Sequence, residues 1–168
     1  MVQLEPHWVQ SARHHVGLRE IPGKATAPAI ARWLRELKAW WSDDETPWCG
    51  VFVAAMLRQG GHQLPRHWYR ARAYLDWGVH CPPVTGTIVI FNGGPKRPGA
   101  GHVGFLVGRD ERRRLMVLGG NQSNAVTIAP FDPARVLGYR WPPNTAVPAV
   151  SALPLLASNG APVSDNEA

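Results

Sequence analysis

Residues 43–56 read DDETPWCGVFVAAM, and this stretch decides how the chain is expected to fold. An acidic cluster and a Thr-Pro pair precede Cys49, and a long apolar run follows it. Thr46 is a favourable N-cap, and Pro47 suits the first helical position, where its missing N–H costs nothing. The run ends at the Gly-Gly pair 60–61, a helix stop. We therefore predict a central, buried helix with Cys49 in its first turn.

The position of Cys49 allows two interpretations. Free N–H groups and the positive end of the helix dipole stabilise a thiolate in the first turn, which suits a nucleophile. A free cysteine in so apolar a helix is also commonly an inert core thiol. Partners elsewhere in the chain must decide between the two.

The spacing of apolar residues predicts the elements around this helix. Two further helices are expected before it, over residues 7–20 and from residue 28 onward. From residue 86 the spacing is that of strands, separated by turns rich in Gly and Asn. The predicted strands are 87–91, 102–107, 114–118, 125–129 and 136–141. In the second strand, one face carries His102, Gly104 and Leu106. The opposite face carries Val103, Phe105 and Val107. Helices followed by an antiparallel sheet of about five strands indicate an α+β fold.

Composition indicates one globular domain. Of the 168 residues, 45% are hydrophobic and 18% are charged, which excludes a disordered chain. We place the domain at residues 1–142. Residues 143–168 are rich in Pro, Ala and Ser without periodicity, and we expect a loose tail or an extended arm there.

The net charge of +6 favours anionic partners such as nucleic acid or acidic wall polymers. The positive residues are spread along the chain, and no nucleic-acid-binding motif is present, so nucleic acid is not the expected partner. No apolar run approaches the length of a membrane span, and we expect no integral membrane association. The N-terminus lacks the apolar segment of a secretory signal, so synthesis in the cytoplasm without a signal peptide is expected.

Two polar residues are candidate partners of Cys49. His102 follows the flexible stretch GGPKRPGAG (93–101) and opens a strand, as a general base on a rigid platform would, although a surface or capping role is the alternative. Asn121 ends the next strand, where a turn would set its amide against the His102 ring; a plain turn asparagine is the alternative. Cys, His and Asn in this order and setting are typical of a papain-like thiol hydrolase.

The chain resembles the CHAP and NlpC/P60 group of cysteine peptidases and amidases, and most closely its small phage- and bacterium-associated CHAP-like members. The matching stretches are EIPG (20–23), DETPWC (44–49), ARAYLDWG (71–78), GHVG (101–104) and LGGNQSN (118–124) with LGYRW (137–141) behind it. The resemblance covers roughly residues 5–142. It implies a papain-like fold with the nucleophile at the N-terminus of the central helix.

The resemblance also implies hydrolysis of peptidoglycan at an amide bond of the stem peptide, the cross-bridge or the sugar–peptide link. Cys49 corresponds to the nucleophile, His102 to the base and Asn121 to the residue that orients the imidazole. Backbone N–H groups at the helix start, including that of Cys49, would hold the oxyanion. Asp44 is a candidate contact for a substrate amine.

Three aromatic residues are candidates for the wall of the substrate groove, with core packing as the alternative: Trp48, Trp77 and Phe91. No cofactor is expected. The acidic residues 43–45 lack the alternating spacing of a calcium loop. The spacing of Cys49, Cys81, His80 and His102 does not support a zinc site, so we expect no metal.

Rival functions are acyl transfer and a non-catalytic, basic module that binds cell walls. Acyl transferases of this fold place the histidine before the cysteine, unlike Cys49 and His102 here. The setting stays open between a phage lysin, a secreted antibacterial effector with an immunity or inhibitor protein, and an enzyme of wall upkeep. In each case we expect a monomer that reaches the periplasmic or extracellular wall after lysis or by specialised secretion.

Overall fold

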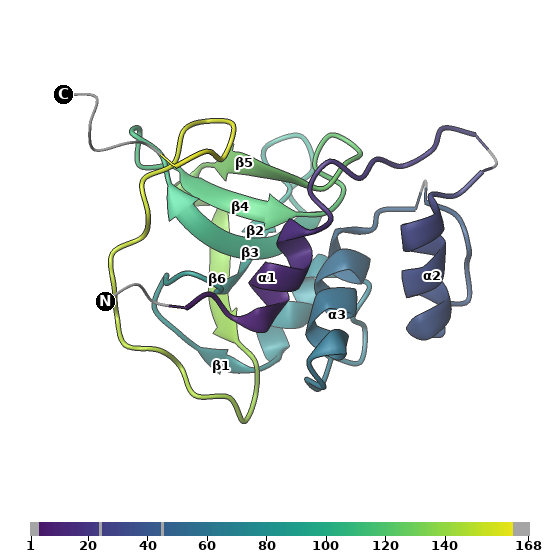
Figure 1. The fold of residues 1–168 in the computed structure, drawn as a ribbon, viewed down its shortest axis with the longest axis horizontal. Coiled ribbons are helices and arrows are strands. Elements are labelled where there is room, and N and C mark those ends of the chain that lie inside the picture. Colours follow the sequence, from purple (N-terminus) through teal and green to yellow (C-terminus); the bar gives the residue numbers. More distant parts are fainter. Residues whose placement is uncertain (1–3, 24, 45, 163–168) are drawn as a thin grey trace.

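The computed structural model describes residues 4–23, 25–44 and 46–162, and it packs helices against an antiparallel sheet (Figure 1). The helices are α1 (His7–Arg13), α2 (Pro28–Glu36) and α3 (Cys49–Gln59), with the 3-10 helices η1 (Ala71–Asp76) and η2 (Pro133–Arg135). The strands are β1 (Val79–His80), β2 (Ile88–Asn92), β3 (Gly101–Arg109), β4 (Leu115–Gly119), β5 (Thr127–Phe131) and β6 (Val136–Trp141). Their order in the sheet is β1-β6-β2-β3-β4-β5. The predicted α+β, papain-like architecture is confirmed.

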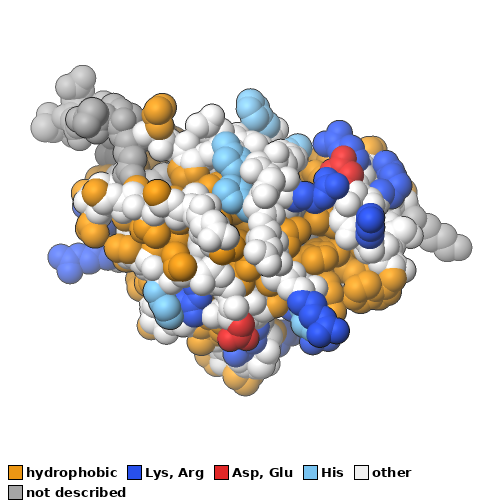
Figure 2. Space-filling model, turned by 90° about the horizontal axis from the view of Figure 1, so that it is seen from below, with side chains coloured by type: hydrophobic (Ala, Val, Ile, Leu, Met, Phe, Trp, Pro, Cys, Tyr) orange, Lys and Arg blue, Asp and Glu red, His pale blue; other side chains and the backbone are white. Residues whose placement is uncertain are grey.

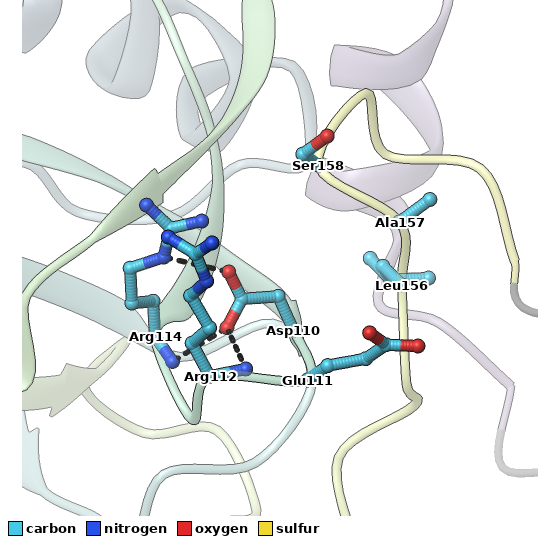
Figure 3. A pocket seen from close by; sticks show the side chains of 7 residues that line it. All are labelled: Asp110, Glu111, Arg112, Arg114, Leu156, Ala157 and Ser158. Carbon is cyan, nitrogen blue, oxygen red and sulfur yellow. Dashed lines mark hydrogen bonds and ion pairs between the residues drawn. The ribbon is translucent and has the colours of Figure 1, made fainter.

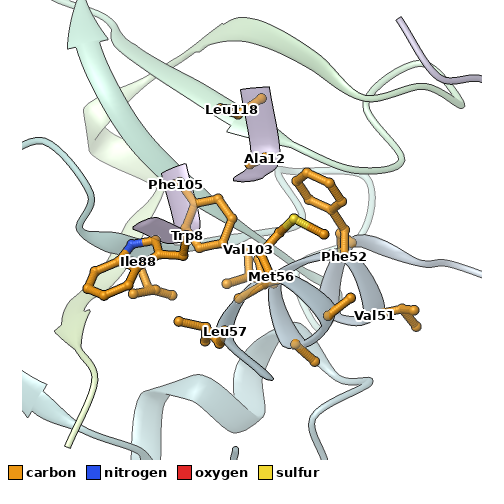
Figure 4. Close-up of a cluster of buried hydrophobic side chains, with 14 of the residues drawn as sticks. Trp8, Ala12, Val51, Phe52, Met56, Leu57, Ile88, Val103, Phe105 and Leu118 are labelled. Carbon is orange, nitrogen blue, oxygen red and sulfur yellow. The ribbon is translucent and has the colours of Figure 1, made fainter. Parts of the chain in front are cut away.

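Helix α3 lies at the centre of the fold. Every residue from Cys49 to Leu57 is buried, and the helix packs against β3, α1 and α2. Figure 4 shows Phe52 of α3 in one cluster with Trp8 of α1 and Phe105 of β3. Burial of this much apolar surface is the main favourable term in folding. The prediction of a central helix that is buried on nearly all sides is confirmed.

Strand β3 separates two hydrophobic cores. Val103 and the odd-numbered residues after it face the helices, whereas Leu106 belongs to a second core on the other face with Val117 of β4. Gly104 lies on this second face, since a Cβ there would be only 2.5 Å from Val117 Cγ1. By the same alternation His102 also lies on the second face, as predicted.

The predicted end of the first helix and the predicted start of β5 are wrong. The first helix ends at Arg13 because residues 17–20 pair with residues 124–126: Arg19 forms an antiparallel bridge with Ala125, and the Gly17 N–H donates to Val126 O. This pairing also occupies the chain before β5, which starts at Thr127 instead of residue 125. Strand β1 was not predicted, because two residues are too few to show a strand pattern.

Basic side chains are scattered over the surface. Figure 2 shows Lys and Arg side chains dispersed among hydrophobic and uncharged ones on one face, without a continuous stripe. A basic stripe is the usual footprint of nucleic-acid binding, and this face lacks one. In the described part of the chain, no helix has the length and apolar character that a membrane crossing requires.

The chain after β6 is extended and lies against the body. Arg109 at the end of β3 donates its N–H to Pro154 O (2.9 Å) and accepts from Leu156 N (2.8 Å). The Leu156 side chain is buried against Gly108, where a Cβ would lie 2.6 Å from Leu156 Cδ1. Figure 3 shows Leu156 beside the β3–β4 hairpin, where Arg114 pairs with Asp110 around a cavity of about 390 Å³. The described part of this arm, residues 143–162, therefore contributes to the packed body.

Truncation of Leu156 tests whether the arm supports the fold. We expect Leu156→Ala to lower the free energy of unfolding by about 2–3 kcal/mol, because it leaves a cavity in a buried site. Val150→Ala on the same arm is the control, since Val150 is 76% exposed, and it should change stability by less than about 0.5 kcal/mol. Urea unfolding measures both. Equal stability of the two variants would show that the arm is not part of the cooperative unit.

Candidate active site

The nucleophile candidate is the first residue of α3. The helix begins at Cys49 with Trp48 as N-cap, two residues later than predicted. Thr46 does not cap the helix, because its N–H and its hydroxyl both donate to Asp43 Oδ1, at 2.7 and 2.8 Å. The Thr46 hydroxyl, which was predicted to cap the helix, is thus part of a local turn with Asp43. Cys49 nevertheless lies in the first turn, as predicted.

Close packing holds the start of α3 in place. Trp48 is buried, and its indole Nε1 donates to Glu20 Oε2 (3.0 Å). Gly50 lies so close to the backbone of residues 68–69 that a Cβ would be 2.8 Å from the Trp68 carbonyl oxygen. The buried Tyr74 hydroxyl bridges the carbonyl oxygens of Gly50 (3.1 Å) and Trp68 (2.9 Å). The backbone around Cys49 is therefore rigid, which suits a nucleophile that must be aimed.

The Cys49 thiol is buried, and burial raises its pKa above that of an ordinary thiol. The backbone N–H groups of Val103, Gly50 and Cys49 itself lie close to the sulfur and act in the opposite direction, but burial is the larger effect. The helix start was expected to stabilise a thiolate. In the free protein it does not outweigh the loss of water, so the resting group is a neutral thiol.

His102 is the second residue of β3 and receives a specific partner. Its Nε2 lies 2.9 Å from Gln122 Oε1. The Gln122 amide nitrogen donates to Val117 O (3.2 Å) and to Thr127, at 3.0 Å for O and 2.9 Å for Oγ1. These acceptors fix the orientation of the Gln122 amide, so its Oε1 faces the ring. Oε1 can only accept a hydrogen bond, so the donor must be the Nε2–H of His102. The neutral imidazole therefore carries its hydrogen on Nε2, and Nδ1 is left as the base.

The amide that contacts the His102 ring is that of Gln122, not that of Asn121. Asn121 adopts a left-handed conformation (φ 56°) in the turn after β4, and among the described residues its side chain makes no hydrogen bond to His102. The next residue turns back toward the sheet, and Gln122 is buried there. Gly119 makes room for it, since a Cβ would lie 2.3 Å from Gln122 Oε1. The sequence signal is the stretch GGNQS (119–123), which contains two adjacent amide side chains, Asn121 and Gln122.

Two aromatic rings fix the plane of the His102 imidazole. Phe131 stacks on it with 5.1 Å between ring centroids and an interplanar angle of 4°. Phe91 on β2 packs behind, 4.8 Å from the Phe131 ring and 6.4 Å from that of His102. Burial lowers the pKa of His102 and the positive charge of Arg135 lowers it further, while the hydrogen bond that His102 donates to Gln122 raises it. The resting base is neutral.

The two candidate catalytic residues, Cys49 and His102, both lie near the start of β3. The Cys49 sulfur lies near the N–H of Val103, the residue that follows His102. Within the described residues no hydrogen bond joins the thiol to the imidazole. Catalytic hydrogen bonds are often long before substrate binds, so this separation is compatible with a catalytic pair. The arrangement brings together a thiol, a base with a free Nδ1 and an amide that orients the ring.

The other predicted substrate contacts lie in the interior. Trp48, Trp77 and Phe91 are buried, so they pack in the core instead of lining a groove. Asp44 is 0% exposed, and its Oδ2 accepts from the N–H groups of Ile21 (3.0 Å) and Ala27 (2.9 Å). Its carboxylate braces the loop before α2 and does not face a substrate.

A different aromatic cluster, in which one ring is exposed and the others are partly buried, lies near the start of α3. The rings of Trp40 and Trp41 lie 4.7 Å apart, and Trp41 stacks on Trp68 at 5.9 Å. Tyr69 closes the group, 4.8 Å from Trp40, whose side chain is 74% exposed. Because residues 68–69 touch Gly50, this surface adjoins the nucleophile. The sequence signal was the Trp-Trp pair at 40–41, which does not follow the helical spacing of α2.

The described residues contain no group of three His, Cys, Asp or Glu side chains that could hold a metal ion. Cys81 is a free thiol that lies 3.5 Å from Thr87 Oγ1, in the loop between β1 and β2. His80 is engaged by Arg140, with 2.9 Å between His80 Nδ1 and Arg140 Nη1. The first contact lies within the connection from β1 to β2. The second joins paired residues of β1 and β6.

The hydrogen bonds of Gln122 predict the protonation of His102. We expect the neutral ring to be the Nε2–H tautomer, with a pKa below the ordinary value of 6.5 because the charged form is poorly solvated. Long-range proton–nitrogen NMR across a pH titration measures both. Gln122→Leu removes the contact that favours the charged ring, so its pKa should fall further. A mainly Nδ1–H ring, or a pKa above 6.5, would contradict this geometry.

Comparison with known proteins gives one family match. Residues 41–121 match the family model of the CHAP domain, a span that includes Cys49 and His102 and stops just before Gln122. A search of the curated proteins finds no match. CHAP domains are typically hydrolases that act as amidases or peptidases. Together with the α+β fold, this match is consistent with a family of the CHAP and NlpC/P60 type, the cysteine peptidases and amidases.

Proposed function

We propose that this protein hydrolyses an amide bond of peptidoglycan, with Cys49 as nucleophile, His102 as general base and acid, and Gln122 as the residue that orients the imidazole. The observation that carries the proposal is the 2.9 Å contact between His102 Nε2 and Gln122 Oε1, which leaves Nδ1 unprotonated. The family match supports amidase or peptidase chemistry. The bond is one in the stem peptide, the cross-bridge or the sugar–peptide link.

The proposed reaction begins with a neutral pair. As the Cys49 sulfur bonds to the amide carbonyl carbon, its proton moves to His102 Nδ1, so the buried thiolate never has to exist alone. The N–H groups of Cys49 and Gly50 precede the first intrahelical hydrogen bond, from Phe52 N to Trp48 O, and would stabilise the oxyanion. His102 then protonates the leaving amine as the C–N bond breaks. A water molecule, deprotonated by His102, attacks the thioester and regenerates the thiol.

The partly exposed aromatic cluster supports a polymer substrate. The faces of Trp40, Trp41 and Tyr69 offer apolar area beside the start of α3. Aromatic faces of this kind pack against the C–H faces of sugar rings, which are the repeating part of peptidoglycan. We propose that the glycan strand passes over this surface. A setting as a phage lysin, or as an antibacterial effector whose producer carries an immunity protein, is consistent with this activity.

The nucleophile assignment predicts a large loss of activity. Cys49→Ala should lower the rate of wall hydrolysis by on the order of 10⁴-fold or more, because no other group can form the acyl intermediate. Cys81→Ala is the matched control and should leave the rate within about twofold. Release of new amine ends from purified walls, with mass spectrometry of the fragments, measures the rate and names the bond. Equal rates in both variants would overturn the assignment, and retention on walls without new ends would indicate a binding module.

The orienting role predicts different effects at two neighbouring positions. Gln122→Leu should lower kcat on the order of 100-fold, because the ring loses its fixed tautomer and plane. Asn121→Gly should have little effect, since glycine tolerates the left-handed backbone at that position. The pH profile of kcat/KM should show an acid limb below pH 6.5 in the wild type, in line with the lowered pKa of His102. A larger loss at Asn121 than at Gln122 would return the orienting role to Asn121.

A further inference from the structure

A mainly apolar pocket with one charged residue, Arg135, lies at the end of β2, the strand beside His102. It has a volume of about 310 Å³ and is lined by Asn92, Gly94, Pro95, Pro98 and Arg135. It is bounded by the glycine-rich loop that leads into His102 and by Arg135 at the end of η2. The mechanism above uses none of these residues.

Arg135 has more donors than partners in this pocket. One nitrogen, Nη2, donates to Asn92 O (2.8 Å). Nε is buried and has no hydrogen-bond partner, and no ion pair of Arg135 occurs within the described residues. The neighbouring acid, Asp132, accepts instead from Ala134 N (2.9 Å). A guanidinium has five N–H donors, and leaving them unpaired in a partly buried place is costly unless a ligand completes them.

Arg135 in this pocket acts electrostatically on His102, the proposed base. The Arg135 guanidinium carbon lies 5.9 Å from the centroid of the Phe131 ring. His102 stacks on the same Phe131 ring. The charge of Arg135 is one cause of the lowered pKa of His102. A negative group bound at Arg135 would offset this charge, which would make His102 a better proton acceptor when substrate is bound.

We propose that Arg135 is the carboxylate-binding residue of the active site and that it recognises a free carboxylate of the peptide part of the substrate. A guanidinium binds a carboxylate through two parallel hydrogen bonds, which is stronger and more specific than contact with a neutral amide. Arg135 and His102 both contact the Phe131 ring, so a carboxylate bound at Arg135 would lie beside the bond that is cut and not at it. This inference rests on the proposed function and adds a preference for stem peptides whose carboxylates are not amidated.

The experiment measures binding without cleavage, in the Cys49→Ala protein. A synthetic stem tetrapeptide with free carboxylates and the same peptide with carboxamides are titrated by calorimetry. The free acid should bind at least about tenfold more tightly, as expected for a hydrogen bond to a charged group. Arg135→Met should abolish this difference. Arg112→Met, which removes an exposed arginine at the β3–β4 hairpin, is the charge-matched control and should preserve it.

A second variant guards against loss of the fold. Arg135→Gln keeps an N–H that can reach Asn92 O but removes the charge, and it should also abolish the preference. Equal affinity for acid and amide peptides, no measurable binding of the acid peptide, or a preference that survives both substitutions would overturn the proposal. If wild-type protein shows the preference but cuts neither peptide nor wall, the hydrolase assignment fails while the carboxylate site stands.

Discussion

Burial of α3 is the constraint on which the rest of the structure depends. The helix is enclosed by α1, α2 and β3, so its first residue is held inside the body instead of projecting into water. Cys49 is therefore aimed by packing, through Trp48 on one side and Gly50 on the other. The same burial removes the solvation that a thiolate needs. Rigidity and a neutral resting thiol thus have a single cause.

The base is prepared by a different part of the fold. His102 lies on the face of β3 that is turned away from the helices, where it belongs with Phe91, Phe131 and Gln122. The amide network through Val117 and Thr127 sets the tautomer, and the stacked rings set the plane. Cys49 therefore lies with the core on the helix side of β3, whereas His102 lies with the core on its other side. Small movements of either face would change their separation, which is a reason for the close packing on both sides.

Burial and the charge of Arg135 both favour neutral groups in the site. Burial and Arg135 both favour a neutral His102, and burial favours a neutral Cys49. A neutral pair avoids isolated buried ions, which are expensive without partners. It also means that proton transfer and bond formation have to be coupled. A substrate that neutralises Arg135 would ease that transfer, so recognition and catalysis are linked through the Phe131 ring.

The sequence by itself determined the fold class and the order of the elements. Apolar periodicity identified α3, and the alternation along β3 placed Val103 and His102 on opposite faces, because both depend on local spacing alone. It also identified Cys49 and His102 as the chemical pair. The pairing of residues 17–20 with the chain before β5 was not visible, since contacts between distant segments leave no periodic signal.

Only the tertiary structure decided which amide orients the imidazole. Asn121 and Gln122 are adjacent and chemically alike, and the choice depends on the left-handed turn at Asn121 and on the space above Gly119. It likewise decided that Trp48, Trp77 and Phe91 are core residues and that Trp40 is exposed. The state of Cys49 also came from the whole fold: position in a helix favours the thiolate, but burial by distant residues outweighs it, because solvation is lost from every side at once.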